Sequence, residues 1–199
     1  MSIYLPLSKL SQWQQVAFSA ALLERMLPNY QLFSETEQFG DYAVVRNQLD
    51  LLWQWLDKNN RSKINFTAQL NKLEEQTPNP ELFDAFGVFP ALDFCMALMS
   101  LFQSIQDKEN DNLDNIGRLS ENSVSFYVEL LLAEALEDDA LEISIEDINN
   151  HPLMQWEIAT QNELFDFLKD ASENKQTCLE IKALALEEGL SNLGIEITG

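Results

Sequence analysis

Residues 82–102, "LFDAFGVFPALDFCMALMSLF", decide the fold, because from Pro90 onward they form an apolar run in which Asp93 is the only charged residue. Apolar residues at almost every position of a helix indicate that the helix is buried inside a bundle. We therefore predict a long central helix from Pro90 to about Gln106. On a helical wheel, successive steps of 7, 4 and 3 residues from Asp93 reach Ser100, Ser104 and Asp107, which share one narrow stripe with it.

Asp93 has two interpretations, one structural and one functional. In the structural one it lies one turn into the helix, where the macrodipole stabilises a carboxylate by roughly 0.3–1 kcal/mol, and it meets water or a neighbouring arginine. In the functional one it is buried with a raised pKa and acts on a ligand in a pocket lined by Phe and Met. We favour the structural interpretation. A buried carboxylate without a partner would be costly, and Arg25 and Arg46 are the candidate partners.

The N-terminal part of the sequence predicts a series of amphipathic helices. Pro28 is expected to end a first helix over residues 8–27 and to begin a short second one, which Gly40 ends. Asp41 is expected to cap the helix that follows. In that helix the four-residue spacing predicts one buried face: Val45, Leu49, Leu52 and Leu56.

Caps and stops continue along the chain. Residues that typically cap the N-terminus of a helix recur along the chain: Asn65, Asn79, and Ser144 together with Asp147. Further helices are predicted over residues 66–76, 79–87, 120–136, 152–171 and 175–188, with an extended tail over 191–199. Because loops are short and no linker or repeat divides the chain, we predict an all-α, single-domain bundle of about nine or ten helices over residues 1–199.

The charge of the chain is strongly negative and unevenly distributed. Its 199 residues include 33 Asp and Glu against 12 Lys and Arg, a net charge of −21. Residues 1–76 hold 8 acids and 7 bases, whereas residues 77–199 hold 25 acids and 5 bases. Direct binding to nucleic acid is disfavoured, because it needs Lys and Arg. The excess acid is interpreted either as a solvated surface or as a face that attracts a basic protein or cations.

Several kinds of chemistry are disfavoured by what the sequence lacks. One histidine, His151, and two distant cysteines, Cys95 and Cys178, do not form a zinc motif, and isolated thiols are typical of a reducing compartment. Residues 107–118 resemble a calcium loop only superficially, since the turn glycine and the final glutamate are missing. We find no phosphate-binding glycine motif, signal peptide or apolar run of membrane-spanning length. We expect no metal, no cofactor, no membrane and a cytoplasmic location.

Six segments form a pattern across the whole chain: "LERMLPNYQLF" (23–33), "FGD" (39–41), "LDLLW" (49–53), "INFTAQLNKLEE" (64–75), "FGVFPALDFCMAL" (86–98) and "SNLGIEI" (191–197). Together they resemble the bacterial YjaG-like family, an all-helical domain family of unknown function. The resemblance implies a compact cytoplasmic helical domain with no assigned activity, cofactor or substrate.

Three hypotheses about function follow. The leading one is a non-enzymatic interaction or regulatory protein that binds a basic protein through an acidic surface on its C-terminal three-fifths, with these candidate residues: Glu137, Asp138, Asp139, Glu142, Glu146 and Asp147. The alternative is a small-molecule-binding protein or enzyme with a polar pocket among the N-terminal and central helices, formed by Arg25, Tyr30, Asp41 and Asp93. The third is mimicry of nucleic-acid charge to block a DNA-binding protein. Nothing in the sequence predicts an oligomeric state.

Overall fold

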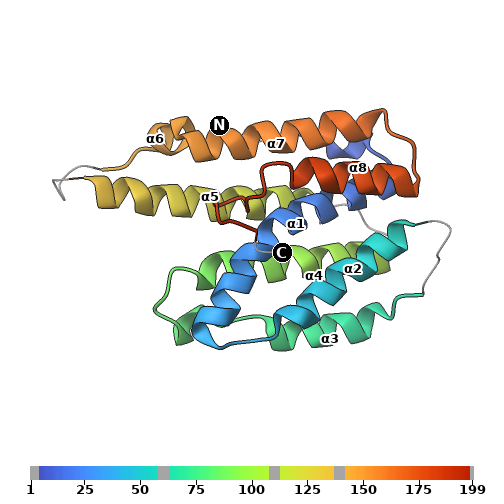
Figure 1. Ribbon diagram of the computed structural model, residues 1–199, viewed down its shortest axis with the longest axis horizontal. Helices are drawn as coiled ribbons and strands as arrows, with labels where there is room; N and C mark the ends of the chain where they lie inside the picture. The colour runs from blue at the N-terminus through green and yellow to red at the C-terminus, as the bar shows by residue number, and fades with distance from the viewer. Residues whose placement is uncertain (1–4, 58–62, 108–112, 137–141, 198–199) are drawn as a thin grey trace.

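The computed structural model describes residues 5–57, 63–107, 113–136 and 142–197. Within these ranges the chain forms eight α-helices and two short 3-10 helices, with no β-strand (Figure 1). In chain order the elements are η1 (Leu7–Lys9), α1 (Gln12–Glu37), α2 (Tyr42–Leu56), α3 (Phe66–Gln76), η2 (Pro80–Leu82), α4 (Val88–Asp107), α5 (Asp114–Ala135), α6 (Ile145–Asn150), α7 (Pro152–Lys169) and α8 (Lys175–Ala185). The predicted all-α fold is confirmed, and the helix number is close to the nine or ten expected.

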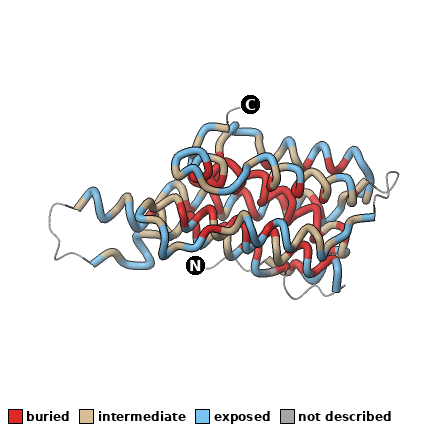
Figure 2. The backbone as a smooth tube through the Cα atoms, turned by 90° about the horizontal axis from the view of Figure 1, so that it is seen from below, coloured by how far each residue is buried: buried red, intermediate tan, exposed pale blue. Residues whose placement is uncertain are grey.

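α1 runs through the bundle between other helices (Figure 1), and the buried residues gather in the interior of the molecule (Figure 2). It packs against α2, α4, α5, α7 and α8. Every residue from Gln15 to Tyr30 is buried, polar and apolar alike. A helix buried on all sides must satisfy its polar side chains through hydrogen bonds to its neighbours. The polar residues of α1 therefore determine which elements it binds.

The predicted helix break at Pro28 is wrong. The helix begins at Gln12, where Ser11 and Gln14 form a capping box, and it continues through Pro28 to Glu37. Proline lacks the N–H that would bind the carbonyl of Glu24, a loss of about 3 kcal/mol or more in a helix interior, and α1 bends near its middle in Figure 1. The burial of the whole segment compensates for this loss. Beside the bend, the backbone N–H of Asn192 donates to the carbonyl of Arg25 at 3.1 Å.

α4 is the second core helix, and it begins at Val88, two residues earlier than expected. Among the described residues, it is the one helix that is long and apolar enough to span a membrane, judged by length and composition only. The expectation that the chain has no apolar segment of membrane-spanning length is therefore wrong. However, 61% of its most apolar window is buried inside the protein. α4 packs against α1, α3 and α5. Its apolar character therefore has a direct explanation in the core of the bundle.

The helix caps that the sequence predicts are confirmed. Asp41 accepts a hydrogen bond from the N–H of Ala43 at the start of α2, and Asn65 does the same from Ala68 at the start of α3. Ser144 and Asp147 form a capping box before α6. These caps satisfy N–H groups that have no partner within the helix.

The C-terminal part of the structure has two unusual features. The last turns of α5 project beyond the other helices (Figures 1 and 2). After α8 the tail folds back on α1 and forms an isolated antiparallel bridge between Leu190 and Glu196, rather than a longer extended piece. Leu193 of the tail joins a small second core with Val124 and Met154. The tail is thus part of the packed domain.

Candidate functional site

A buried ion pair joins α1 to α7. Nη1 of Arg25 donates to Oε2 of Glu157 at 2.6 Å, and both side chains are completely inaccessible to solvent. Oε1 of Glu157 also accepts hydrogen bonds from Ser120 of α5, at 2.6 Å, and from Gln161, at 2.7 Å. The guanidinium group of Arg25 lies 4.4 Å from the ring centre of Trp156, a favourable cation–π distance. All these partners are the protein's own, which indicates a structural role for Arg25.

The same polar network continues from Ser120 to the tail. Nδ2 of Asn192 donates to Oγ of Ser120 at 3.0 Å, and Oδ1 of Asn192 accepts from Nδ2 of Asn29 at 2.7 Å. Three buried atoms of the network have no hydrogen-bond partner among the described residues: Nε and Nη2 of Arg25, and Oδ1 of Asn29. Native proteins leave few buried polar atoms unpaired, so these atoms are unusual.

A second buried cluster surrounds Glu24, the residue before Arg25 on α1. Its carboxylate accepts two hydrogen bonds from Arg46, at 2.7 and 2.8 Å, one from Nε1 of Trp53 and one from Lys182 of α8. Burial alone would raise the pKa of Glu24, but the hydrogen bonds and charges of Arg46 and Lys182 hold it below its usual value. Four donors of the protein itself therefore hold this carboxylate, three at Oε1 and one at Oε2.

A cavity of about 270 Å³ adjoins this cluster, between α2 and α8. Its two lysines are already paired, Lys182 with Glu24 and Lys175 with Asp57 at 3.6 Å. Cys178 also lines the cavity, but burial raises the pKa of its thiol to about 11, so it is protonated at neutral pH and a poor nucleophile. The cavity offers neither a free charge nor a reactive group among its lining residues.

Tyr30 and Asp41 meet at the junction of α1, α2 and α3. The hydroxyl of Tyr30 donates to the carbonyl of Gln76 at 3.0 Å, while the side chain of Gln76 accepts the N–H of Asp41 at 2.7 Å. Burial raises the pKa of Tyr30, and the charges of Cys95 and Asp41 raise it further. Tyr30 therefore stays protonated at neutral pH, as its hydrogen bond to a carbonyl requires.

Asp93 is partly buried on α4, and its partner is a serine. Its Oδ2 accepts a hydrogen bond from Oγ of Ser123 on α5 at 2.7 Å. Burial raises the pKa of Asp93, and the bond from Ser123 only partly offsets this effect. The expected pairing with Arg25 or Arg46 is wrong, because those arginines bind Glu157 and Glu24 instead.

The structure brings together only two of the four residues expected around a polar pocket. Tyr30 and Asp41 share Gln76, whereas Arg25 belongs to the α1–α7 ion pair and Asp93 to the α4–α5 contact. None of the four lines the cavity between α2 and α8 or the apolar cavity described next. In the described part of the chain, no three His, Cys, Asp or Glu side chains gather as metal ligands would.

A second cavity, which we call the tail pocket, lies between α1, the start of α4, α5 and the tail. Its volume is about 290 Å³. Most of its wall is apolar, with these principal contributors: Leu32, Phe33, Phe86, Pro90, Leu193 and Ile195. Asn29, the residue whose Oδ1 lacks a partner, also lines it. Sequence analysis missed this pocket, since its walls come from segments more than 160 residues apart.

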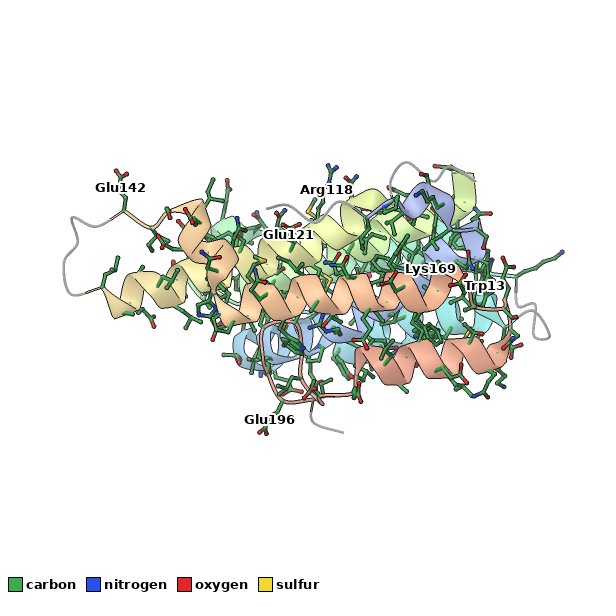
Figure 3. The ribbon with its side chains drawn as sticks, turned by 90° about the horizontal axis from the view of Figure 1, so that it is seen from above. Trp13, Arg118, Glu121, Glu142, Lys169 and Glu196 are labelled. Carbon is green, nitrogen blue, oxygen red and sulfur yellow. The ribbon has the colours of Figure 1, made fainter. Side chains whose placement is uncertain are left out.

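Three of the six acidic candidates are described by the structure. Glu142, Glu146 and Asp147 are exposed, and the side chain of Glu142 points away from the body (Figure 3). Glu137, Asp138 and Asp139 lie outside the described residues. Hydrogen bonds from Ser144 lower the pKa of Asp147, so it stays charged well below neutral pH. Two further exposed acids, Glu129 and Glu134, lie on the last turns of α5.

Sequence analysis also missed how complete this charge bias is. Residues 119–168 contain 12 Asp and Glu but neither Lys nor Arg. In the same region three large apolar side chains are exposed: Phe126 by 45%, Leu130 by 37% and Ile145 by 78%. We call residues 126–136 and 142–150 the acidic arm. It combines negative charge with uncovered apolar surface, a pairing common in interaction sites.

Comparisons with known proteins agree with this fold. A family model described as "Protein of unknown function (DUF416)" matches residues 2–196. The "Uncharacterized protein YjaG" of Escherichia coli K12 is 36% identical over 194 residues, covering 97% of this chain and 95% of that protein. An "Uncharacterized protein" of Haemophilus influenzae is 32% identical over 197 residues, covering 98% and 96%.

A solved structure extends the similarity to three dimensions. The crystal structure of a DUF416 family protein from Shewanella baltica OS155 has a TM-score of 0.83 and 34% identity to this chain, covering 98% of it and 100% of the crystallised chain. Both the sequence matches and the shared helical fold extend over nearly the whole chain. The chain therefore belongs to the DUF416 family, which includes the YjaG proteins that its sequence resembles.

Proposed function

We propose that this is a non-enzymatic interaction protein of the cytoplasm, which binds a basic partner protein through its acidic arm. The observation that supports the proposal most is the run of residues 119–168, with 12 acids and neither Lys nor Arg. In most surface helices acids and bases alternate and neutralise one another. Here Glu157 is paired with Arg25 and Asp166 with Lys169, but the run itself supplies no base, and its negative potential attracts positive partners over distances of about a Debye length.

The apolar residues of the arm determine what kind of partner fits. Phe126 and Leu130 lie one turn apart on α5, and the ring of Phe126 packs edge-on against Phe89 of α4, with ring centres 5.1 Å apart. Phe89 is itself 41% exposed. A partner segment with apolar residues on one face and Lys or Arg on its flanks would cover these side chains and neutralise the surrounding acids.

The buried acids of the protein are less suitable as a functional site. Glu24 and Glu157 each accept several hydrogen bonds from side chains of the protein, and Asp93 accepts one from Ser123. The exposed acids of the arm lie on the surface instead, although Asp147 among them also caps α6 through Ser144. This difference favours the surface of the protein over its interior as the place where it acts.

Affinity capture from native-host lysate tests the proposal. The arm variant Glu129→Gln/Glu134→Gln/Glu146→Gln removes three charges, and the control Glu163→Gln/Glu187→Gln/Glu188→Gln removes three exposed charges elsewhere. We expect wild type and control to retain the same basic protein at 50 mM salt, in stoichiometric amounts, and to release it at moderate salt. The arm variant should bind it roughly tenfold more weakly, since each exposed charge pair contributes about 0.2–1 kcal/mol.

Three results would refute the proposal. The first is that no partner binds at any ionic strength. The second is a partner that stays bound in molar salt, where charges are screened within about 3 Å. The third is an equal loss of binding in the arm variant and the control, which would mean that total charge matters and the arm does not.

A further inference from the structure

We infer that the tail pocket is a binding site for a small apolar molecule that carries a hydroxyl or amine group. This inference is independent of the acidic arm and of any partner protein. It rests on two observations: an apolar cavity of about 290 Å³, and a buried residue in its lining, Asn29, whose Oδ1 has no partner. The volume is at the lower end of the range for small-molecule sites, roughly 300–1,000 Å³.

Asn29 determines the polarity of the ligand. Its side chain is only 2% exposed, and its Nδ2 donates to Oδ1 of Asn192 at 2.7 Å. The amide of Asn192 is in turn oriented by its donation to Ser120 at 3.0 Å. These bonds fix the Asn29 amide so that its remaining atom, Oδ1, is an acceptor, and no described residue donates to it. The ligand must therefore supply a donor, as a hydroxyl or an amine does.

The walls of the pocket determine the rest of the ligand. Phe33 and Leu32 come from α1, Phe86 from the segment before α4, and Leu193 from the tail. An aromatic ring or a short branched chain fills such a space by replacing water against apolar side chains. Glu37 also belongs to the lining and carries a negative charge. The site therefore favours an amine or an alcohol over a carboxylate of the same shape.

Four matched probes test these requirements by isothermal titration calorimetry and thermal shift on the full chain. They are 2-phenylethylamine, 2-phenylethanol, ethylbenzene and 3-phenylpropionate, which share a ring and differ in the polar group. We expect the amine and the alcohol to bind at least tenfold more tightly than ethylbenzene, because ethylbenzene leaves Oδ1 of Asn29 unpaired. The carboxylate should bind most weakly.

Two variants locate the binding. Ala85→Phe and Thr36→Trp each place a large side chain in the lining of the pocket, and both should abolish binding of the alcohol. The control Ala159→Phe also replaces an alanine with a phenylalanine, but on the exposed side of α7. It should bind the alcohol as the wild type does. Asn29→Ala should remove the preference for the alcohol over ethylbenzene. Circular dichroism and melting curves establish which variants are folded, and two filling variants provide an independent result if one is not.

Three outcomes would overturn the inference. One is that none of the probes binds at millimolar concentration. Another is that ethylbenzene and 2-phenylethanol bind equally, which would reveal an apolar cavity without a role for Asn29. The last is binding that persists in both folded filling variants, because the probes would then occupy some other place.

Discussion

Replacing Glu157 with Gln should destabilise the protein strongly, because it leaves a buried charge without its counterion. In the wild type Oε2 of Glu157 accepts from Arg25, while Oε1 accepts from Ser120 and Gln161. In the variant, the oxygen of the side-chain amide still accepts hydrogen bonds from Ser120 and Gln161. Its nitrogen then faces Nη1 of Arg25, so that two donors meet and the guanidinium charge is uncompensated.

The size of the effect follows from the complete burial of both side chains. Removing one partner of a buried ion pair costs about 3–5 kcal/mol. For a chain of 199 residues, where 1 kcal/mol shifts Tm by about 2–4 °C, this corresponds to a fall in Tm of roughly 6–20 °C. Since folded proteins are stable by only about 5–15 kcal/mol, the variant loses a large part of its margin.

A double-mutant cycle separates the loss of the charge pair from general damage to the core. Arg25→Met removes the charge but retains an unbranched chain of similar length. We expect the double variant R25M/E157Q to be more stable than E157Q alone, with a coupling of about 2–3 kcal/mol. Urea unfolding followed by circular dichroism measures the free energies. Additive losses, or a cost of E157Q below about 1 kcal/mol, would refute the electrostatic explanation.

Two further predictions concern single positions. Burial holds the pKa of Asp93 above its ordinary 3.8, so its charged form lowers stability at pH 7 and this penalty disappears as pH falls to 3.8. Asp93→Asn should therefore raise Tm at pH 7, and a similar gain at pH 3.5 would contradict this reasoning. Gly40 has a φ of +68°, and a Cβ there would collide with the hydroxyl of Tyr30. Gly40→Ala should cost about 2–3 kcal/mol in urea unfolding, whereas Gly194→Ala, at a φ of +78° with open space around it, should cost only about 1–2 kcal/mol.

The parts of the fold that sequence reasoning predicted are those set by local interactions. Asp41, Asn65 and Ser144 cap their helices within three residues along the chain, so their types and positions are sufficient evidence. The buried face of α2 is likewise visible in its spacing, since Val45 and Leu49 lie one turn apart and both are fully buried. Neither inference needs any knowledge of the tertiary arrangement.

The parts that sequence reasoning missed depend on contacts between distant segments. Pro28 is a reliable helix stop by local rules, but the burial of α1 on all sides overrides it. The partner of Arg25 lies 132 residues away, and the bond between Asn29 and Asn192 spans 163 residues. For Asp93 the sequence predicts contact with water or with a neighbouring arginine, whereas the partner in the structure is Ser123 of α5. Long-range polar pairs of this kind leave no periodic signal in a single sequence.

The polar residues of α1 also explain how the tail and the pocket are related. Glu24 binds α2 and α8, Arg25 binds α7, and Asn29 binds the tail, so one buried helix holds the other elements through specific hydrogen bonds. Of these three residues, Asn29 alone lines the tail pocket.

A donor group on a ligand would complete the hydrogen bonds of Asn29, while the body of the ligand would pack against Leu193 of the tail. Ligand binding and tail docking would then share the same contacts, so each must strengthen the other by the same free energy. The tail also contributes Asn192 to the network that contains Ser120 of α5. Occupation of the pocket would therefore stabilise the helix whose far end forms part of the acidic arm. Such coupling requires only that the tail dock more firmly, with no rearrangement of the bundle.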